Sequence, residues 1–447
     1  MKNTVTALTA LVMTSLVSAC SRAPGGDPPL PAPSAPSESA APTAASTSRR
    51  LALASPGGTA EVDRLIGDAQ RGLAKIPDKI DLWTILGRLW IRKARETADP
   101  GFYSNAGACA AVILEIEPDN RLARGLEAQV KLNEHAFVEA MDLADRALSR
   151  EADDLVALGV KSDACLELGR FDDAVKAAQR MVDIKPNLPA YVRASYLKWL
   201  HGQNDEAKRV ARLAIDAGKD PHDPEPGAWA IVQSAMIFWS EGDYGGADAG
   251  FDLALTKLKD FPPALVGKGR AALARGDAKA AALHLSRAFE QSPLVETAWY
   301  LADARAAAGD TDGAAKAIAE VERRGRQSDH RSLALFFAVK NRNVDEAVRL
   351  AEAEKKTRGD VWTEDALAWA YYRAGRLQDA KEASSRATRL GTRDAQLWYH
   401  AGAIKLALGD KAGGLRQIKE ALKLSPKFDV TGAEEAAALV AAAEKKP

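Results

Sequence analysis

The sequence predicts an all-α solenoid, because three observations indicate repeated pairs of short helices. Beyond Ala60, nearly every segment has the apolar spacing of an amphipathic helix of about 12 to 15 residues, and short Gly, Asp or Pro turns separate these segments. The turns recur at intervals that are mostly 33 or 34 residues. Small residues recur in register with the turns. The chain of 447 residues is therefore expected to form one elongated array and not several globular domains.

Residues 1–19 have the features of an export signal. Lys2 precedes an apolar stretch from Val5 to Val17, which is too short to cross a bilayer as a helix. The stretch that ends at Cys20, Leu-Val-Ser-Ala-Cys, resembles the lipobox of bacterial lipoproteins. This resemblance implies lipidation of Cys20 (palmitate) and a place in the bacterial cell envelope. With Ser21 next, it also implies the outer membrane, facing the periplasm. The alternative is an ordinary signal peptide cleaved just before an incidental Cys20.

Residues 20–59 are predicted to be a disordered tether that follows the lipidated cysteine. From Ser21 to about Ala54 the chain consists largely of Ala, Ser, Thr and Pro, with seven prolines between Pro24 and Pro42. Such a segment cannot bury enough apolar surface to fold. We expect it to hold the folded body away from the membrane.

The array itself is predicted over residues 80–427. Its units are expected to start near Ile80, Arg121, Leu155, Leu188, Ala228, Pro262, Val295, Ser328, Val361 and Ala395. Because the end of an array has no neighbour to cover its apolar face, the ends need caps. A leading helix is predicted within residues 60–79, from Ala60 to Ile76, and a C-terminal capping helix within residues 428–447, from Val430 to Ala443.

Within each unit, two antiparallel helices can approach closely only where small side chains face each other. Places are counted from the first residue of each unit. Small residues occupy the eighth place, on the first helix, at Gly87, Ala128, Ser162, Ser195, Ala235, Gly269, Ala302, Ala368 and Gly402. They also occupy the twentieth place, on the second helix, at Ala140, Ala174, Ala207, Ala247, Ala281, Ala314, Ala347, Ala380 and Gly414. A residue able to adopt positive φ is expected to end the first helix at Gly169, Gly202, Gly242, Gly276, Gly309, Gly375 and Gly409.

The run from Leu168 to Pro186, which begins Leu-Gly-Arg-Phe-Asp-Asp-Ala, resembles the tetratricopeptide repeat (TPR). The resemblance extends over about four fifths of the chain and implies a right-handed α-solenoid of about ten helix-turn-helix units. Three units depart from the pattern. Those starting at Ile80 and Leu188 run long, which predicts a surface loop in each. The unit at Ser328 has larger residues where the others are small, which indicates a reoriented joint.

Family geometry assigns the tryptophans to two sets. In TPR arrays, the second, fifth, ninth and twelfth places of each first helix line the concave face. The resemblance therefore implies that Trp83, Trp90 and Trp398 are core residues. It implies a partner-binding groove formed by Tyr196, Trp199, Trp229, Met236, Trp239, Trp299, Trp362, Asp365, Trp369 and Tyr372. Such an aromatic groove suits an apolar or amphipathic peptide. The alternative is that several tryptophans fill the space between neighbouring first helices.

No catalytic, cofactor or metal site is predicted. The motifs HExxH, GxSxG, GxxxxGK[ST] and a dinucleotide GxGxxG are absent from the sequence. The loop His222-Asp223-Pro-Glu225 could hold a metal, although a capped turn is the better interpretation. Cys109 and Cys165 lie a whole helical pair apart, so we expect two buried free thiols. Equal numbers of basic and acidic residues, 61 each, do not favour a nucleic-acid partner.

These features support three functional hypotheses. The first is a membrane-anchored TPR scaffold or adaptor that binds a protein or peptide partner in its concave groove, in envelope assembly, secretion or cell-wall remodelling. The alternative is a lipoprotein that binds a small ligand or a glycan in the tryptophan-lined groove. An unrecognised enzyme is the third, and no nucleophile, base or metal set can be named for it.

Overall fold

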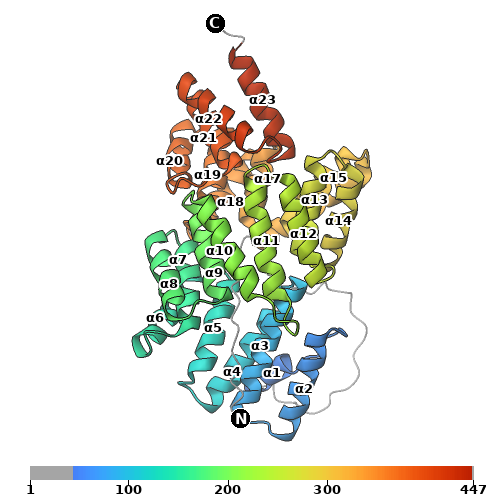
Figure 1. Ribbon diagram of the computed structural model, residues 1–447, viewed down its shortest axis with the longest axis vertical. Coiled ribbons are helices and arrows are strands. Elements are labelled where there is room, and N and C mark those ends of the chain that lie inside the picture. Colours follow the sequence, from blue (N-terminus) through green and yellow to red (C-terminus); the bar gives the residue numbers. More distant parts are fainter. Residues whose placement is uncertain (1–43, 445–447) are drawn as a thin grey trace, which may run out of the picture.

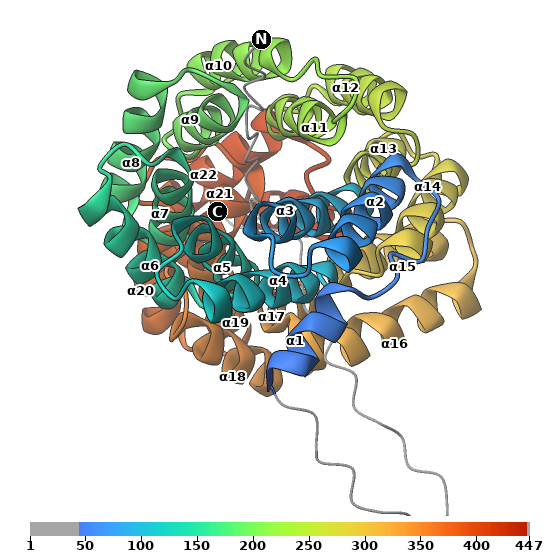
Figure 2. The same cartoon turned by 90° about the horizontal axis from the view of Figure 1, so that it is seen from below.

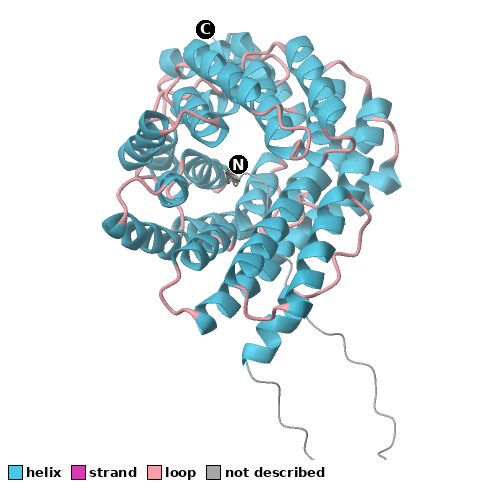
Figure 3. Ribbon diagram, turned by 60° about the horizontal axis from the view of Figure 1, so that its bottom comes forward, coloured by secondary structure: helices cyan, strands magenta, loops and turns pink. Residues whose placement is uncertain are grey.

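The computed structural model describes residues 44–444, and within this range all regular secondary structure is helical (Figure 3). Ten helix pairs follow one another. Their first helices are α3 (Ile80–Thr97), α5 (Arg121–Asn133), α7 (Leu155–Glu167), α9 (Leu188–Leu200), α11 (Glu225–Ser240), α13 (Pro262–Ala274), α15 (Val295–Ala307), α17 (His330–Val339), α19 (Val361–Arg373) and α21 (Ala395–Ala407). Their second helices are α4 (Phe102–Ile116), α6 (Phe137–Arg150), α8 (Phe171–Ile184), α10 (Asn204–Ala217), α12 (Tyr244–Lys257), α14 (Ala278–Gln291), α16 (Thr311–Ser328), α18 (Val344–Lys355), α20 (Leu377–Ala387) and α22 (Lys411–Leu424).

Most first helices begin where local signals predict. Eight start at the predicted residue, whereas α11 begins three residues early, at Glu225, and α17 two residues late, at His330. Asp and Asn side chains at many of these starts accept bonds from backbone N–H groups that have no partner within the helix. Asp154, for example, accepts bonds from the N–H groups of Val156 and Ala157 in α7. Helix starts are therefore encoded locally.

The predicted close contact within each pair is confirmed. Small residues at the eighth and twentieth places are buried. Two eighth-place serines bond directly to the twentieth-place alanine of the same unit: the hydroxyl of Ser162 donates to the carbonyl of Ala174 at 3.0 Å, and that of Ser195 to Ala207 at 2.8 Å. These bonds show directly that the two helices of a pair approach closely at these places.

The predicted tether is wrong over its last part, because residues Ala44–Ala52 form helix α1, which packs against α4. Ala52 is fully buried, and its carbonyl accepts a bond from Trp90 Nε1 at 3.0 Å. Asn105 of α4 donates to the carbonyl of Leu51 at 2.8 Å. The segment has too little apolar surface to fold alone, but the array supplies both a surface and hydrogen-bond donors. The predicted leading helix follows as α2 (Glu61–Lys75).

The C-terminal capping helix is confirmed as α23 (Val430–Glu444). Glu435 attaches it to the array, because its carboxylate pairs with Arg373 of α19 at 2.6 Å and accepts a bond from Tyr399 of α21 at 2.9 Å. The predicted signal peptide, Cys20 and the tether up to residue 43 lie outside the described residues.

The array winds back on itself. As a result, the turn between the two helices of one unit contacts the loop that follows the unit five places later in the array. The hydroxyl of Ser292 donates to the carbonyl of Ala98 at 2.7 Å, and that of Thr392 to Leu200 at 2.6 Å. The hydroxyls of Tyr244 and Ser425 share a bond of 2.9 Å. These partners are 194, 192 and 181 residues apart in sequence. Figure 1 shows the N-terminal and C-terminal units at opposite ends, and Figure 2 shows the helices as a ring.

Candidate ligand-binding cavity

A cavity of about 270 Å³, called here the interior cavity, lies inside the ring. Its walls come mainly from the first helices α9, α11, α13, α15, α17, α19 and α21, with Phe428 and Asp429 added from the segment before α23. The interior cavity therefore lies on the concave side of seven consecutive units and is bounded by residues far apart in sequence.

One wall is a stack of aromatic rings from two successive superhelical turns. The rings of Trp199 and Trp362 are stacked with centroids 5.8 Å apart, and Tyr196 lies 5.5 Å from Trp199. Trp362 Nε1 donates to the hydroxyl of Tyr196 at 3.1 Å, and Trp199 Nε1 donates to Ser240 at 3.1 Å. Because these polar atoms are bonded to one another, the stack presents mainly ring surface to the interior cavity.

A second wall surrounds Arg270 of α13. Its guanidinium carbon lies 4.8 Å from the ring centroid of Trp239 and 4.9 Å from that of Tyr300. The hydroxyl of Tyr300 donates to Glu296 at 2.8 Å. Burial raises the pKa of the Glu296 carboxyl, and the positive charge of Arg270 opposes part of that rise. This wall combines aromatic surface with a cation.

Three aspartates also line the interior cavity, and each has partners within the fold. Asp365 pairs with Nδ1 of His400 at 2.9 Å. Asp394 accepts a bond from the backbone N–H of Leu397 at the start of α21. Asp429 accepts bonds from two backbone N–H groups at the start of α23. Burial raises the pKa of the Asp394 carboxyl, and the nearby charge of Asp365 adds to the rise.

The structure brings eight of the ten predicted groove residues together around the interior cavity. These are Tyr196, Trp199, Trp229, Met236, Trp239, Trp299, Trp362 and Asp365. Trp199, Trp229 and Trp362 are half-buried, whereas Trp239 is only 7 % exposed and Trp299 only 6 %. The eight residues therefore lie on the concave side, as their places in the first helices predict. The rings of Trp239 and Trp299 lie deeper than they would in a fully open groove.

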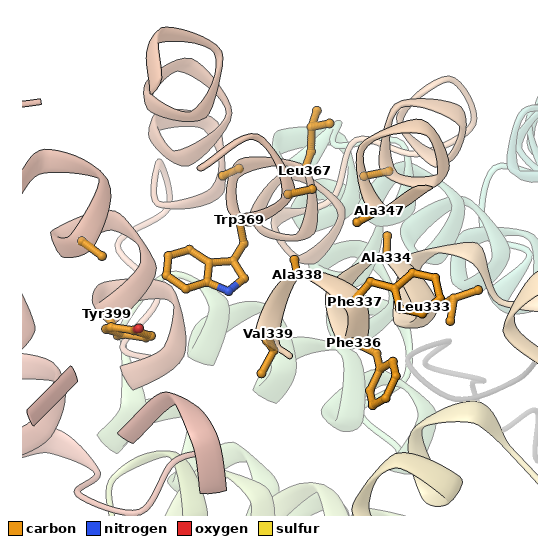
Figure 4. Close-up of a cluster of buried hydrophobic side chains, with 14 of the residues drawn as sticks. Leu333, Ala334, Phe336, Phe337, Ala338, Val339, Ala347, Leu367, Trp369 and Tyr399 are labelled. Carbon is orange, nitrogen blue, oxygen red and sulfur yellow. The ribbon is translucent and has the colours of Figure 1, made fainter. Parts of the chain in front are cut away.

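Trp369 and Tyr372 do not line the interior cavity, which corrects the predicted groove. Trp369 is 1 % exposed and stacks on His400 with centroids 4.0 Å apart and on Tyr372 at 4.6 Å. Figure 4 shows its ring directed toward Tyr399 of the neighbouring first helix. The alternative interpretation holds for this tryptophan: it fills the space between α19 and α21, because these helices pack closely under the C-terminal cap.

The tryptophans assigned to the core differ in depth. Trp83 is 1 % exposed and Trp90 is fully buried, as predicted, whereas Trp398 is half-buried. Trp83 and Trp398 share the fourth place of their units and the same bond: Nε1 donates to the carbonyl six residues earlier, that of Pro77 at 2.8 Å and that of Thr392 at 3.0 Å. Both indole rings are therefore hydrogen-bonded to the loop that precedes their own helix.

Several residues of the interior cavity were not among the predicted groove residues. Arg270, at the ninth place of its helix, does share the predicted concave register, and Glu296 stands at the second place, which is also concave, so the register could have identified Glu296 as well. Tyr300 stands at the sixth place, and Phe428 precedes the capping helix, so neither carries a signal in the sequence.

The remaining candidate chemistry is used within the fold. Cys109 and Cys165 are buried and not bonded to each other, as predicted, and burial raises the pKa of both thiols. In the loop considered as a metal site, Asp223 pairs with Arg92 at 3.3 Å, and Glu225 pairs with Arg95 at 2.9 Å. Within residues 44–444, no group of three or more His, Cys, Asp or Glu side chains is arranged to hold a metal ion.

Comparison with known proteins gives likeness at the level of architecture only. No protein-family profile matches the chain, and no curated protein matches its sequence. Among solved structures, the type IV pilus biogenesis factor PilW is 18 % identical over 48 % of this chain and 96 % of its own, with a TM-score of 0.40. Yeast Tom70 is 13 % identical over 86 % and 95 %, with 0.38, and human IFIT1 with PPP-AAAA is 12 % identical over 85 % and 94 %, with 0.46.

The described chain is a TPR-type solenoid. The chain's own repeats establish this: ten consecutive helix pairs, positive φ between 71° and 92° at the seven predicted turn glycines, and buried small residues at the predicted contact places. Between residues 44 and 444, none of the helices is both long and apolar enough to span a bilayer. A fold of this type does not by itself specify a function, which has to be argued from the site.

Proposed function

We propose that this protein is a lipid-anchored TPR adaptor that binds part of a partner protein in its interior cavity. In this proposal Cys20 carries the lipid, the following residues tether the array to the outer membrane, and the array faces the periplasm. The observation that supports binding is the convergence of five tryptophans from four first helices on one cavity. Trp and Tyr side chains dominate the affinity of many protein interfaces.

The volume of the interior cavity limits what can enter. About 270 Å³ lies just below the roughly 300–1,000 Å³ typical of ligand pockets. An α-helix with its side chains is about 10–12 Å across, so a partner helix would not fit within that volume. The proposed occupant is a short extended segment of the partner that inserts a few apolar side chains.

Replacing Trp229 with Ala tests this proposal. Trp229 is half-buried, lines the interior cavity, and its Nε1 has no hydrogen-bond partner among residues 44–444. We expect Trp229→Ala to keep the fold and to weaken capture of cross-linked envelope partners by about 2 kcal/mol or more. The matched control, Trp83→Ala, should instead destabilise the fold by about 3 to 5 kcal/mol. Unchanged capture by folded Trp229→Ala would exclude the interior cavity as the partner site.

Binding of a small-molecule ligand is the second candidate function, and the lining of the interior cavity favours it. Helices from seven units surround a space that holds charged groups as well as aromatic rings. A small ligand should raise the melting temperature of the purified protein with no other protein present, because binding to the folded state alone stabilises it. Stabilisation that requires a partner protein would support the adaptor instead.

The lipid anchor has its own test. Cys20→Ser should release the protein from the membrane fraction, because two or more acyl chains are needed for stable anchoring and the variant cannot carry them. Cells that express the wild-type chain serve as the control for fractionation. A Cys20→Ser protein that sediments with membranes as before would place the anchor elsewhere.

A further inference from the structure

Arg270 differs from every other charged residue that lines the interior cavity. The other five have partners: Arg331 pairs with Asp360 at 3.4 Å, Asp365 pairs with His400, and Glu296, Asp394 and Asp429 each accept at least one hydrogen bond from the chain. Within residues 44–444, Arg270 has no carboxylate within ion-pair distance and no oxygen acceptor. Its one polar contact is the sulfur of Met236 at 4.0 Å.

The surroundings of Arg270 fix its position without using its hydrogen-bond donors. The rings of Trp239 and Tyr300 each lie within 5 Å of the guanidinium carbon. Aromatic faces attract a cation but accept its N–H groups only weakly. A guanidinium has five N–H donors in a planar fork that matches carboxylate, sulfonate or phosphate oxygens. The site therefore presents a fork of N–H donors to which residues 44–444 offer no oxygen acceptor.

Arg270 also lies at the junction of two cavities. A smaller one, of about 140 Å³, shares Trp239, Arg270, Tyr300, Phe428 and Asp429 with the interior cavity and extends beneath α23. On the other side of Arg270, the interior cavity is lined by tryptophan rings and apolar side chains from α9 and α11. A ligand that satisfies both regions has a charged group at one end and a flat apolar body at the other.

We propose that the interior cavity is a receptor for a small amphipathic anion, whose carboxylate, sulfonate or phosphate group binds Arg270 while its apolar body lies against Trp229 and Trp239. This inference rests on the proposed use of the interior cavity as a binding site. It deepens the small-ligand form of that function by naming the chemical class of the ligand.

Two fluorescent probes that share one aromatic skeleton test the inference. Anilinonaphthalene sulfonate carries an anion, whereas phenylnaphthylamine has the same rings without the sulfonate. A purely apolar cavity would bind the neutral probe at least as tightly, because that probe loses less hydration. We expect the full-length protein to bind the anionic probe about tenfold tighter or more, since a hydrogen-bonded charge contributes roughly that factor. Energy transfer from the cavity tryptophans reports binding inside the ring.

Variants of two arginines, one in the last turns of α13 and one directly after the helix, assign the effect. Arg270→Gln should lose the tenfold preference while its affinity for the neutral probe is unchanged, and Arg270→Lys should keep part of the preference. Arg275→Gln is the matched control, because Arg275 is exposed, pairs with Asp248 and does not line either cavity. We expect it to behave as wild type. A preference that survives in Arg270→Gln would overturn the inference.

The wild-type comparison decides the question even if Arg270→Gln fails to fold. Equal affinity of the wild-type protein for both probes would overturn the anion receptor and leave the interior cavity as an apolar binding site. Binding of neither probe would remove the interior cavity as a small-ligand site, and the inference with it. The failure of the inference and the failure of the small-ligand function therefore give different results.

Discussion

The turn glycines of units three to five and those of the later units share a backbone conformation but differ in what surrounds them. All seven have positive φ. A Cβ atom at Gly169, Gly202 or Gly242 would lie 2.4 to 2.6 Å from a backbone carbonyl oxygen of the next superhelical turn. A Cβ atom at any of the four later glycines would have no neighbouring atom within 4 Å. These glycines are Gly276, Gly309, Gly375 and Gly409.

The difference shows that one sequence signal serves two physical demands. In the later units, glycine is needed only because other residues rarely adopt positive φ. In the earlier units the absent side chain also lets a second superhelical turn pack on the first, at the contacts that close the ring around the interior cavity. Gly359 N–H donates to the carbonyl of Glu167 at 2.8 Å beside one such glycine. Three predictions test whether the turns that contact a second superhelical turn differ in stability from those that do not.

The largest expected difference is between Gly202→Ala and Gly309→Ala. Alanine at positive φ costs about 1 kcal/mol at either place. At Gly202 the new methyl group must also displace the carbonyl of Gly391, and such overpacking costs roughly 1 to 3 kcal/mol more. Denaturant unfolding of both variants should therefore show a loss about two to four times as large for Gly202→Ala. Equal losses would mean that the two superhelical turns are not in contact there.

The contact inside each helix pair should not depend on which superhelical turn it belongs to. Ala174 and Ala281 occupy the twentieth place in an early and a later unit, and both are fully buried. Leucine at either place should overpack the pair and reduce the free energy of unfolding by about 1 to 3 kcal/mol. Thermal melts of the two variants should agree within the lower end of that range. A variant that melts like wild type would contradict the register of its unit.

The smallest effect concerns one hydroxyl between the superhelical turns. Thr392→Val removes the bond to the carbonyl of Leu200 and leaves that buried group unpaired, which should cost about 1 to 2 kcal/mol. Thr388→Val is the control, because Thr388 directly follows α20 and its hydroxyl bonds locally to the carbonyl of Ser384 in that helix, at 2.8 Å. We expect the control to lose less than about 0.5 kcal/mol, measured by chemical unfolding. A Thr388→Val loss as large as that of Thr392→Val would argue against an inter-turn bond.

Local signals account for what could be predicted of the candidate site. A residue's place within its first helix largely decides whether it points into the ring, so eight cavity residues are predictable from their places alone. The prediction was wrong for Trp369. Its place normally faces the concave side, but α19 and α21 approach closely here, so its ring is buried between these two helices. The register also could not indicate Tyr300 or Phe428, whose roles depend on neighbours from other units and from the cap.

The sequence by itself determined the helix pairs, their order and their small-residue contacts, because caps, turn glycines and apolar spacing act within about 35 residues. The tertiary structure alone decided that the array closes into a ring, that α1 packs on α4, and that Arg270 lies in the interior cavity with no carboxylate of residues 44–444 within ion-pair distance. Closure depends on small rotations that accumulate over five units, and it joins residues 181 to 194 positions apart. No periodic signal in the sequence spans that distance. Only the assembled superhelix therefore shows which turns and loops contact one another.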